Sequence, residues 1–130
     1  MVPSLSTLRS LVVLVVEDDR SLRELFRATL REECYSVVAV ADGVDALTYL
    51  ETNTPAVLVL DLGLPRLSGL DVLADMAATG LTQKVPVIVV TGQSQESVTV
   101  TGVSCVLHKP FGLDELRDAV RRCVSQQRAT

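Results

Sequence analysis

Short runs of apolar residues alternate along this chain with segments whose apolar residues recur at helical spacing. The runs occupy residues 11–16, 36–40, 56–60, 86–90 and 103–107. They are rich in valine and mostly lack a polar–apolar alternation, which is typical of strands buried on both faces of a parallel sheet. The pattern therefore predicts five strands, each followed by a helix.

The segments between the runs have the three- and four-residue spacing of helices with one apolar face. The clearest stripe is the last one, which consists of Leu113, Leu116, Val120, Cys123 and Val124. Strand and helix alternating five times predict an α/β fold, with a single doubly wound five-stranded parallel sheet and helices on both faces. The flavodoxin-like strand order 2-1-3-4-5 would place the first and third strands side by side.

The length and the continuity of the pattern indicate one domain. A chain of 130 residues is long enough to bury a core of its own. Residues 1–10 (MVPSLSTLRS) lack a pattern and are expected to form a flexible arm, so the domain is expected to span residues 11–128.

Charge and composition narrow the candidate partners. The net charge of −4 argues against nucleic acid or an anionic membrane as a direct partner. The longest apolar run has six residues, far below the roughly 20 that span a bilayer. Three cysteines without a CxxC pair are typical of reduced thiols, so a cytoplasmic location is expected.

Polar residues follow four of the five apolar runs. They are Glu17, Asp18 and Asp19 after the first run, Asp61 after the third, Thr91 after the fourth and Lys109 after the fifth. Ligands of open α/β sheets bind beyond the carboxyl ends of the strands, near the point where the strand order reverses. If the first and third strands are neighbours, Asp18 and Asp61 converge on one pocket.

The residue types at these positions suit phosphoryl chemistry. Crowded carboxylates repel one another, and a hard divalent cation with oxygen ligands, such as Mg²⁺, resolves the repulsion. A lone ammonium (Lys109) and a lone hydroxyl (Thr91) suit the oxygens of a phosphoryl group, and an aspartate is a competent nucleophile for its transfer.

Each residue also has a structural interpretation. Asp18 or Asp19 would be an ordinary N-cap of the first helix, and Asp61 could be a turn residue. Thr91 could open a loop, and Lys109 could be a solvated lysine before a proline. Only the conjunction of all four at one sheet edge favours a site.

Four segments in order, VLVVEDD, VLVLDLGLPRLSG, VIVVTG and HKPF, resemble the receiver domains of bacterial response regulators. The resemblance runs from Leu11 to about Arg128. It implies a phospho-acceptor signalling domain of a two-component phosphorelay, not a classified enzyme. The donor would be a phosphohistidine on a sensor histidine kinase or a histidine phosphotransfer protein, and the downstream target is open.

The same resemblance implies a role for each site residue. Asp61 would be the phospho-acceptor, with Thr91 and Lys109 holding the phosphoryl oxygens. Asp18, Asp61 and the main-chain carbonyl of Gly63 would bind Mg²⁺ directly, with Glu17 reaching it through water. The Lys109–Pro110 peptide bond is often cis in this family.

The chain departs from the family pattern near the site. Gly63 leaves no side chain two residues after Asp61, Gln93 is neutral, and Val106 replaces the usual aromatic residue or histidine. Thr91 and Lys109 are only 18 residues apart. The segment between them is rich in serine and threonine, so a short or partly disordered fourth helix is expected.

Two other functions are alternatives, a pseudo-receiver with the same fold and a phosphohydrolase that also uses an aspartate at a strand end. A pseudo-receiver would be a protein-interaction module that takes no phosphate, and the altered residues around Val106 favour it. A phosphohydrolase of the haloacid dehalogenase type needs a second acid at the position of Gly63, which argues against that class.

With the last helix ending near residue 127, no room for a DNA-binding domain is expected, so the chain is either a stand-alone regulator or part of a larger protein. A weak homodimer is a further candidate assembly.

Overall fold

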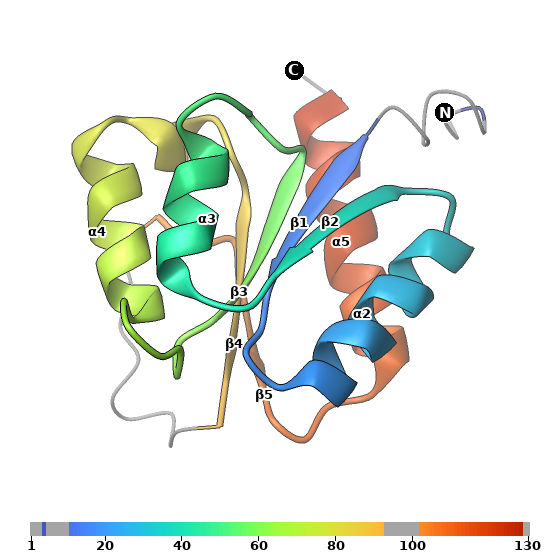
Figure 1. Ribbon diagram of the computed structural model, residues 1–130. Helices are drawn as coiled ribbons and strands as arrows, with labels where there is room; N and C mark the ends of the chain where they lie inside the picture. The colour runs from blue at the N-terminus through green and yellow to red at the C-terminus, as the bar shows by residue number, and fades with distance from the viewer. Residues whose placement is uncertain (1–3, 5–10, 93–101, 129–130) are drawn as a thin grey trace.

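The computed structural model describes Ser4, residues 11–92 and residues 102–128. Five strands form one parallel sheet in the order β2-β1-β3-β4-β5 (Figure 1). The strands are β1 (Val12–Val16), β2 (Ser36–Val40), β3 (Val57–Asp61), β4 (Val87–Thr91) and β5 (Cys105–His108). The predicted fold class and strand order are confirmed.

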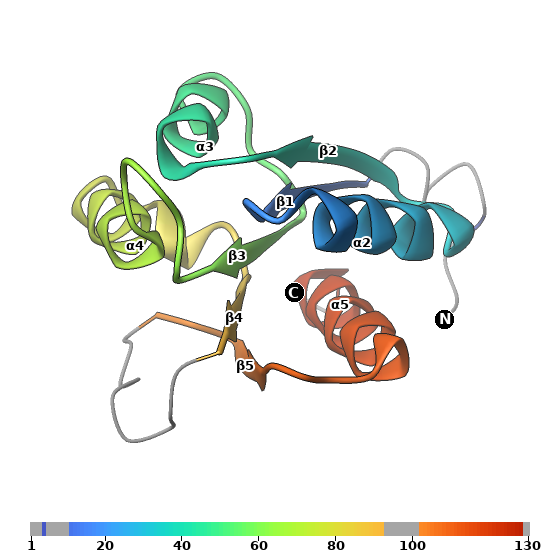
Figure 2. The same ribbon diagram turned by 60° about the horizontal axis from the view of Figure 1, so that its bottom comes forward.

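Helices cover both faces of this sheet (Figure 2). Helices α2 (Arg20–Glu32) and α5 (Leu113–Arg128) lie on one face, and α3 (Gly43–Leu50) and α4 (Gly69–Ala78) lie on the other. A short 3-10 helix, η1 (Leu81–Gln83), leads from α4 toward β4. Among the described residues, no helix has both the length and the apolar character needed to cross a membrane.

The strands send alternate side chains to the two layers. In β1, Val13 and Val15 belong to the cluster that packs against α2 and α5, whereas Leu14 and Val16 belong to the cluster under α3 and α4. All four side chains are at most 1% exposed. This burial on both faces explains why the apolar runs show no polar–apolar alternation.

Strands β3, β4 and β5 each end one residue beyond the predicted run. Asp61 ends β3 and pairs with Val90, and Thr91 ends β4 and pairs with His108. Both polar residues therefore belong to the hydrogen-bonded ladder, which fixes their backbones more firmly than a loop would. The fifth strand begins two residues later than predicted, at Cys105.

Side-chain caps define where the helices begin. Asp19 caps α2 by accepting a hydrogen bond from Leu22 N at 2.9 Å, and Asp42 caps α3 through Asp45 N at 2.9 Å. The N-cap interpretation is therefore confirmed for Asp19 and not for Asp18. Asp19 caps the helix, and Asp18 remains available for the site.

The end of α2 has a strained backbone. Cys34 follows the helix with a φ of 72°, a left-handed conformation that costs a residue with a Cβ roughly 1–2 kcal/mol. Glycine would adopt this conformation without that cost.

Two expected features lie outside the described residues. The expected short fourth helix, with Gln93, falls within residues 93–101, and the expected arm falls within residues 1–10, of which the structure describes only Ser4.

Gly69 allows the start of α4 to lie directly against the end of β3. A Cβ at this position would lie 2.5 Å from Asp61 O and 2.7 Å from Leu62 Cα. We expect Gly69→Ala to lower the free energy of unfolding by about 1–3 kcal/mol, because backbone atoms would have to move. Urea denaturation measures this. Gly92→Ala is the control, since a Cβ there meets nothing within 4 Å, and an equal loss in both variants would contradict the packing argument.

Candidate functional site

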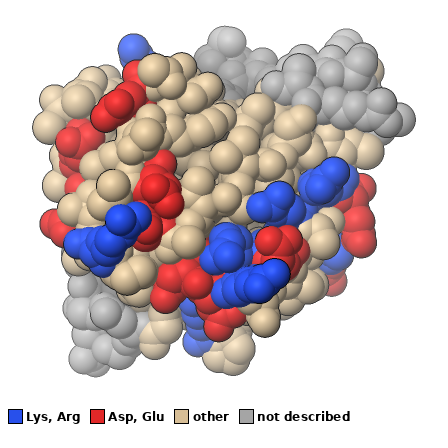
Figure 3. Space-filling view, viewed as in Figure 1, with Lys and Arg blue, Asp and Glu red and all other residues tan. Residues whose placement is uncertain are grey.

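The carboxyl ends of the strands lie at the lower edge of the sheet in Figure 1. Glu17 and Asp18 follow β1, Asp61 ends β3, Thr91 ends β4 and Lys109 follows β5. Since β1 pairs with β3 and β3 with β4, the sheet brings together residues that are far apart in sequence. On the face shown in Figure 3, acidic and basic side chains are interspersed and do not form one broad patch of either sign.

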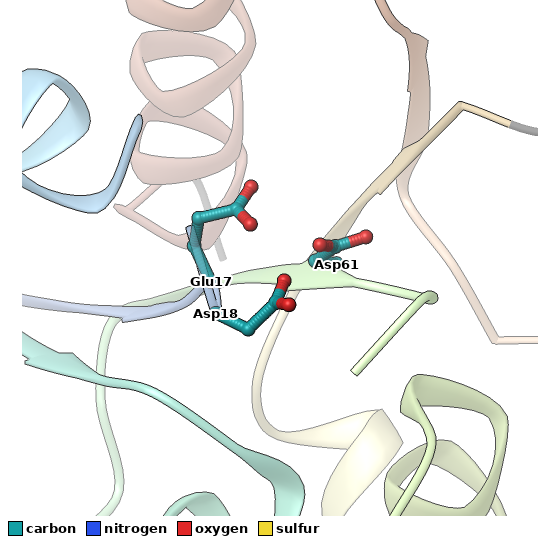
Figure 4. A group of neighbouring side chains, drawn as sticks. All are labelled: Glu17, Asp18 and Asp61. Atoms are coloured by element: carbon teal, nitrogen blue, oxygen red, sulfur yellow. The ribbon is translucent and has the colours of Figure 1, made fainter. Parts of the chain in front are cut away.

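Three carboxylates form the centre of the site (Figure 4). Glu17, Asp18 and Asp61 each offer one oxygen atom, and these atoms all lie within 4.8 Å of one another. Glu17 and Asp61 are buried, whereas Asp18 is exposed. The arrangement is open to solvent on the side of Asp18 and closed on the side of Glu17.

Lys109 is the cation that contacts the two buried acids. Its Nζ donates to Glu17 Oε1 at 3.0 Å and lies 3.5 Å from Asp61 Oδ2. Burial alone would lower the pKa of Lys109, but its contacts with Glu17 and Asp61 outweigh burial and raise the pKa above its usual value. The lysine therefore stays charged and is not the solvated residue of the structural interpretation.

The pKa of Glu17 shows that the Lys109 ammonium does not compensate for the burial of this carboxylate beside Asp61. Burial, followed by the neighbouring Asp61, raises it from 4.5 to about 7, although Lys109 and the N–H of Asp19 act in the opposite direction. An isolated buried charge is costly. The site thus lacks positive charge at neutral pH.

The backbone holds the acids in place. Gly63 N donates to Asp61 Oδ1 at 3.0 Å, and Asp19 N donates to Glu17 Oε2 at 3.2 Å. Arg23 Nη1 donates to the carbonyls of Glu17 at 3.0 Å and Asp18 at 3.3 Å. Main-chain groups therefore take part in each of these contacts, either as donors to the acids or as acceptors from Arg23.

Thr91 and Lys109 lie next to each other across the end of the sheet. Thr91 is 1% exposed, and its carbonyl accepts a hydrogen bond from Lys109 N at 2.8 Å. The Lys109–Pro110 bond is cis, as the resemblance implies. The structure thus places Glu17, Asp18, Asp61, Thr91 and Lys109 at the same edge of the sheet.

The oxygen donors fit a hard divalent cation. Carboxylates and a main-chain carbonyl are the ligands that Mg²⁺ binds in proteins, and the unbalanced charge around Glu17 would be relieved by such an ion. A thiophilic metal is not favoured, because the cluster contains no cysteine or histidine.

Two departures from the family pattern fall among the described residues. A Cβ at Gly63 would lie 3.7 Å from Asp61 Oδ1, an ordinary contact, so the backbone does not require glycine and the open space beside Asp61 is a property of this sequence. Val106 is partly buried and packs against the cluster under α3 and α4.

Some features of the site have no clear sequence signal. A groove of about 540 Å³ adjoins Lys109 and Gly92 and is otherwise lined by apolar residues of α2 and of the segment before α5, and by the first residue of α5. In it, Phe26 and Phe111 stack with their ring centroids 5.7 Å apart, and Leu25 is 44% exposed. Helical spacing alone assigns Leu25 to the core, so only the structure reveals the groove.

Solved structures of similar proteins include two with magnesium in their titles. The receiver domain of the sensor histidine kinase PA1611 from Pseudomonas aeruginosa, with a magnesium ion coordinated in its active site cleft, is 28% identical with a TM-score of 0.80, covering 88% of this chain and 98% of that one. Response regulator TrrA from Thermotoga maritima, in complex with Mg²⁺–BeF, is 26% identical with a TM-score of 0.78, covering 87% of this chain and 98% of that one.

The sequence comparisons agree with the structural ones. Response regulator MprA of Mycobacterium sp. (strain KMS) is 40% identical over 113 residues, which are 84% of this chain and 48% of that protein. The chain therefore spans about half the length of the curated relatives it matches. The family model of the response regulator receiver domain matches residues 13–121. The chain belongs to the family of response regulator receiver domains.

Proposed function

We propose that this receiver domain accepts a phosphoryl group on Asp61 in a Mg²⁺-dependent reaction. The donor is a phosphohistidine on a sensor histidine kinase or a histidine phosphotransfer protein. The observation that carries the proposal is the cluster of three carboxylates whose two buried members contact one ammonium group, Lys109. That set of charges suits a divalent cation and a phosphoryl group together.

The two oxygens of Asp61 support different roles. Oδ1 accepts the hydrogen bond of Gly63 N, which orients the carboxylate, and Oδ2 lies on the side of Lys109. In the transfer, an oxygen of Asp61 forms the new P–O bond while the P–N bond of the donor breaks and its electron pair returns to the imidazole nitrogen. Lys109 and Thr91 receive the phosphoryl oxygens.

Asp18, Asp61 and the carbonyl of Gly63 would hold the Mg²⁺ ion directly, with Glu17 acting through water. The ion would neutralise charge that develops on the phosphoryl oxygens. Asp18 is the exposed member of the cluster, which supports its role as a direct ligand on the side from which an ion enters.

The groove beside Lys109 supports a protein donor. It offers an apolar surface that is continuous with the site through Gly92 and Lys109, as expected where a partner must approach Asp61.

The domain spans residues 11–128 and works in the cytoplasm, where its thiols remain reduced.

The acceptor assignment predicts the result of a single substitution. Asp61→Asn keeps the size of the side chain and removes the nucleophilic carboxylate, so labelling by acetyl phosphate should be abolished. Intact-mass spectrometry measures it, with Asp75→Asn on α4 as the control that retains labelling. Undiminished labelling of the Asp61 variant would overturn the assignment, and an unlabelled wild type would favour the pseudo-receiver.

The metal assignment predicts a gain of stability with Mg²⁺. An ion that binds only the folded chain stabilises it by roughly 2.7 kcal/mol at 100 times its dissociation constant. Asp18→Asn should remove most of this gain, whereas Asp19→Asn should retain it, because Asp19 caps α2 and asparagine also caps helices. Thermal denaturation with and without Mg²⁺ measures the gain, and equal gains in both variants would contradict the role of Asp18.

The raised pKa of Glu17 predicts how the metal-free protein depends on pH. The folded state holds the proton up to about pH 7, whereas the unfolded chain releases it near 4.5. The contribution to stability is therefore fully present below about 4.5 and is lost as the pH rises through 7.

Glu17→Gln tests this dependence, because glutamine has nearly the size of the protonated glutamate and does not ionise. Its single amide oxygen can accept from Lys109 or from Asp19 N, but not from both. In EDTA at pH 8, the variant should have a higher melting temperature than the wild type. Its free energy of unfolding should exceed that of the wild type by up to about 3 kcal/mol. At pH 4.5 the difference should nearly vanish. A difference that is the same at both pH values would rule out ionisation of Glu17 as its cause.

A further inference from the structure

The β3–α4 loop (residues 62–68) carries part of the proposed site. Its residue Gly63 donates its N–H to Asp61 Oδ1 at 3.0 Å, and its carbonyl is a proposed ligand of the metal. At its base, Leu62 N donates to Val90 O at 3.1 Å, and Gly69 N donates to Leu62 O at 3.3 Å. These bonds hold the two ends of the loop but not its middle.

The middle of the loop contains a strained residue. Arg66 has a φ of 63°, although it is not glycine. A residue with a side chain in this conformation costs roughly 1–3 kcal/mol and persists only where its surroundings hold it. Such strain clusters at functional positions. The contacts that keep Arg66 in this conformation therefore indicate a role for the position of the loop.

The side-chain contacts of Arg66 come from the start of α3, where Asp45 Oδ1 also lies 3.8 Å from the Nη2 of Arg66. Arg66 Nε donates to Asp42 Oδ2 at 3.0 Å, and its Nη2 contacts the same oxygen. The other oxygen of Asp42 caps α3 through Asp45 N at 2.9 Å. Asp42 is 8% exposed, and its two oxygens thus join the helix and the loop.

The backbones of α3 and the loop are also in direct contact. A Cβ at Gly43 would lie 2.3 Å from Leu67 O, so only glycine lets the first turn of α3 approach the loop this closely. Arg66 and Gly63 are separated by Leu64, which is buried, and by Pro65, whose ring fixes its φ. A shift at Arg66 therefore reaches the Gly63 peptide through a short and stiff segment.

We propose that the Arg66–Asp42 ion pair is a positioning element for the phosphoryl-accepting site. It seats the β3–α4 loop against the start of α3 and so orients the Gly63 peptide, with its N–H toward Asp61 and its carbonyl toward the metal. Neither residue touches the reacting groups. The inference rests on the proposed function, because it concerns the metal ligand that Gly63 supplies.

The pair can be broken without removing the helix cap. Asp42→Asn retains an oxygen for Asp45 N and removes the charge opposite Arg66, and Arg66→Gln removes the partner charge. Arg66→Gly removes the side chain and relieves the backbone strain at the same time. Arg121→Gln is a matched control, because Arg121 pairs with Glu33 at 2.6 Å in the contact between α2 and α5 and its side chain, like that of Arg66, is 58% exposed.

Calorimetry measures the dissociation constant of Mg²⁺ for each variant. Thermal denaturation in EDTA measures its melting temperature without the ion. We expect Asp42→Asn, Arg66→Gln and Arg66→Gly each to weaken Mg²⁺ binding roughly tenfold, the low end for groups that orient metal ligands. Arg66→Lys should restore part of the affinity. The double variant should be no weaker than either single one, because both remove the same contact. Acetyl phosphate labelling should recover at saturating Mg²⁺.

Three outcomes separate this inference from others. Unchanged Mg²⁺ affinity with a lowered melting temperature would show that the pair is only structural. An equal loss of affinity in Arg121→Gln would show a general effect of charge and would also overturn the inference. A wild type that binds no Mg²⁺ would defeat the proposed function itself, and that result is distinct from an unchanged variant of a protein that binds the ion.

Discussion

The structure depends on an excess of negative charge at the carboxyl edge of a buried sheet. Glu17 and Asp61 lie where the two central strands end, and the single ammonium of Lys109 contacts both. The raised pKa of Glu17 follows from this imbalance, since burial leaves the ionised form without enough compensation. Around this excess charge, backbone N–H groups bind the acids, and Arg23 binds the carbonyls beside them. Arg66 pairs with Asp42, which caps α3. These contacts hold the acids in position.

The fold could be predicted from the sequence because its strands are buried on both faces. Strands such as Val57–Asp61 form uninterrupted apolar runs, and a polar residue at the end of four of the five runs marks the edge of the sheet. The candidate site was predicted from the polar residues that follow the strands together with the strand order, which brings Glu17 and Lys109 within 3.0 Å although they are 92 positions apart. Parallel pairing in the order 2-1-3-4-5 leaves few other arrangements.

Other features could not be predicted, since they depend on geometry with no periodic signal. The left-handed conformation of Arg66 has no marker in the residue type, and its contact with Asp42 joins two loops 24 positions apart. The apolar groove could not be predicted for a different reason. Leu25 has the spacing of a core residue and is nevertheless 44% exposed. Helical periodicity identifies a face but does not show whether a neighbouring element covers it.

The loop after β1 is tied through its main chain, and this has an evolutionary consequence. Arg23 binds the carbonyls of Glu17 and Asp18 and not their side chains, so a mutation of either acid leaves these bonds available. Chemistry and architecture can therefore be lost separately. A lineage could therefore lose the carboxylate of Glu17 or Asp18 and still keep the path of this loop, and inactive descendants with the same scaffold would result.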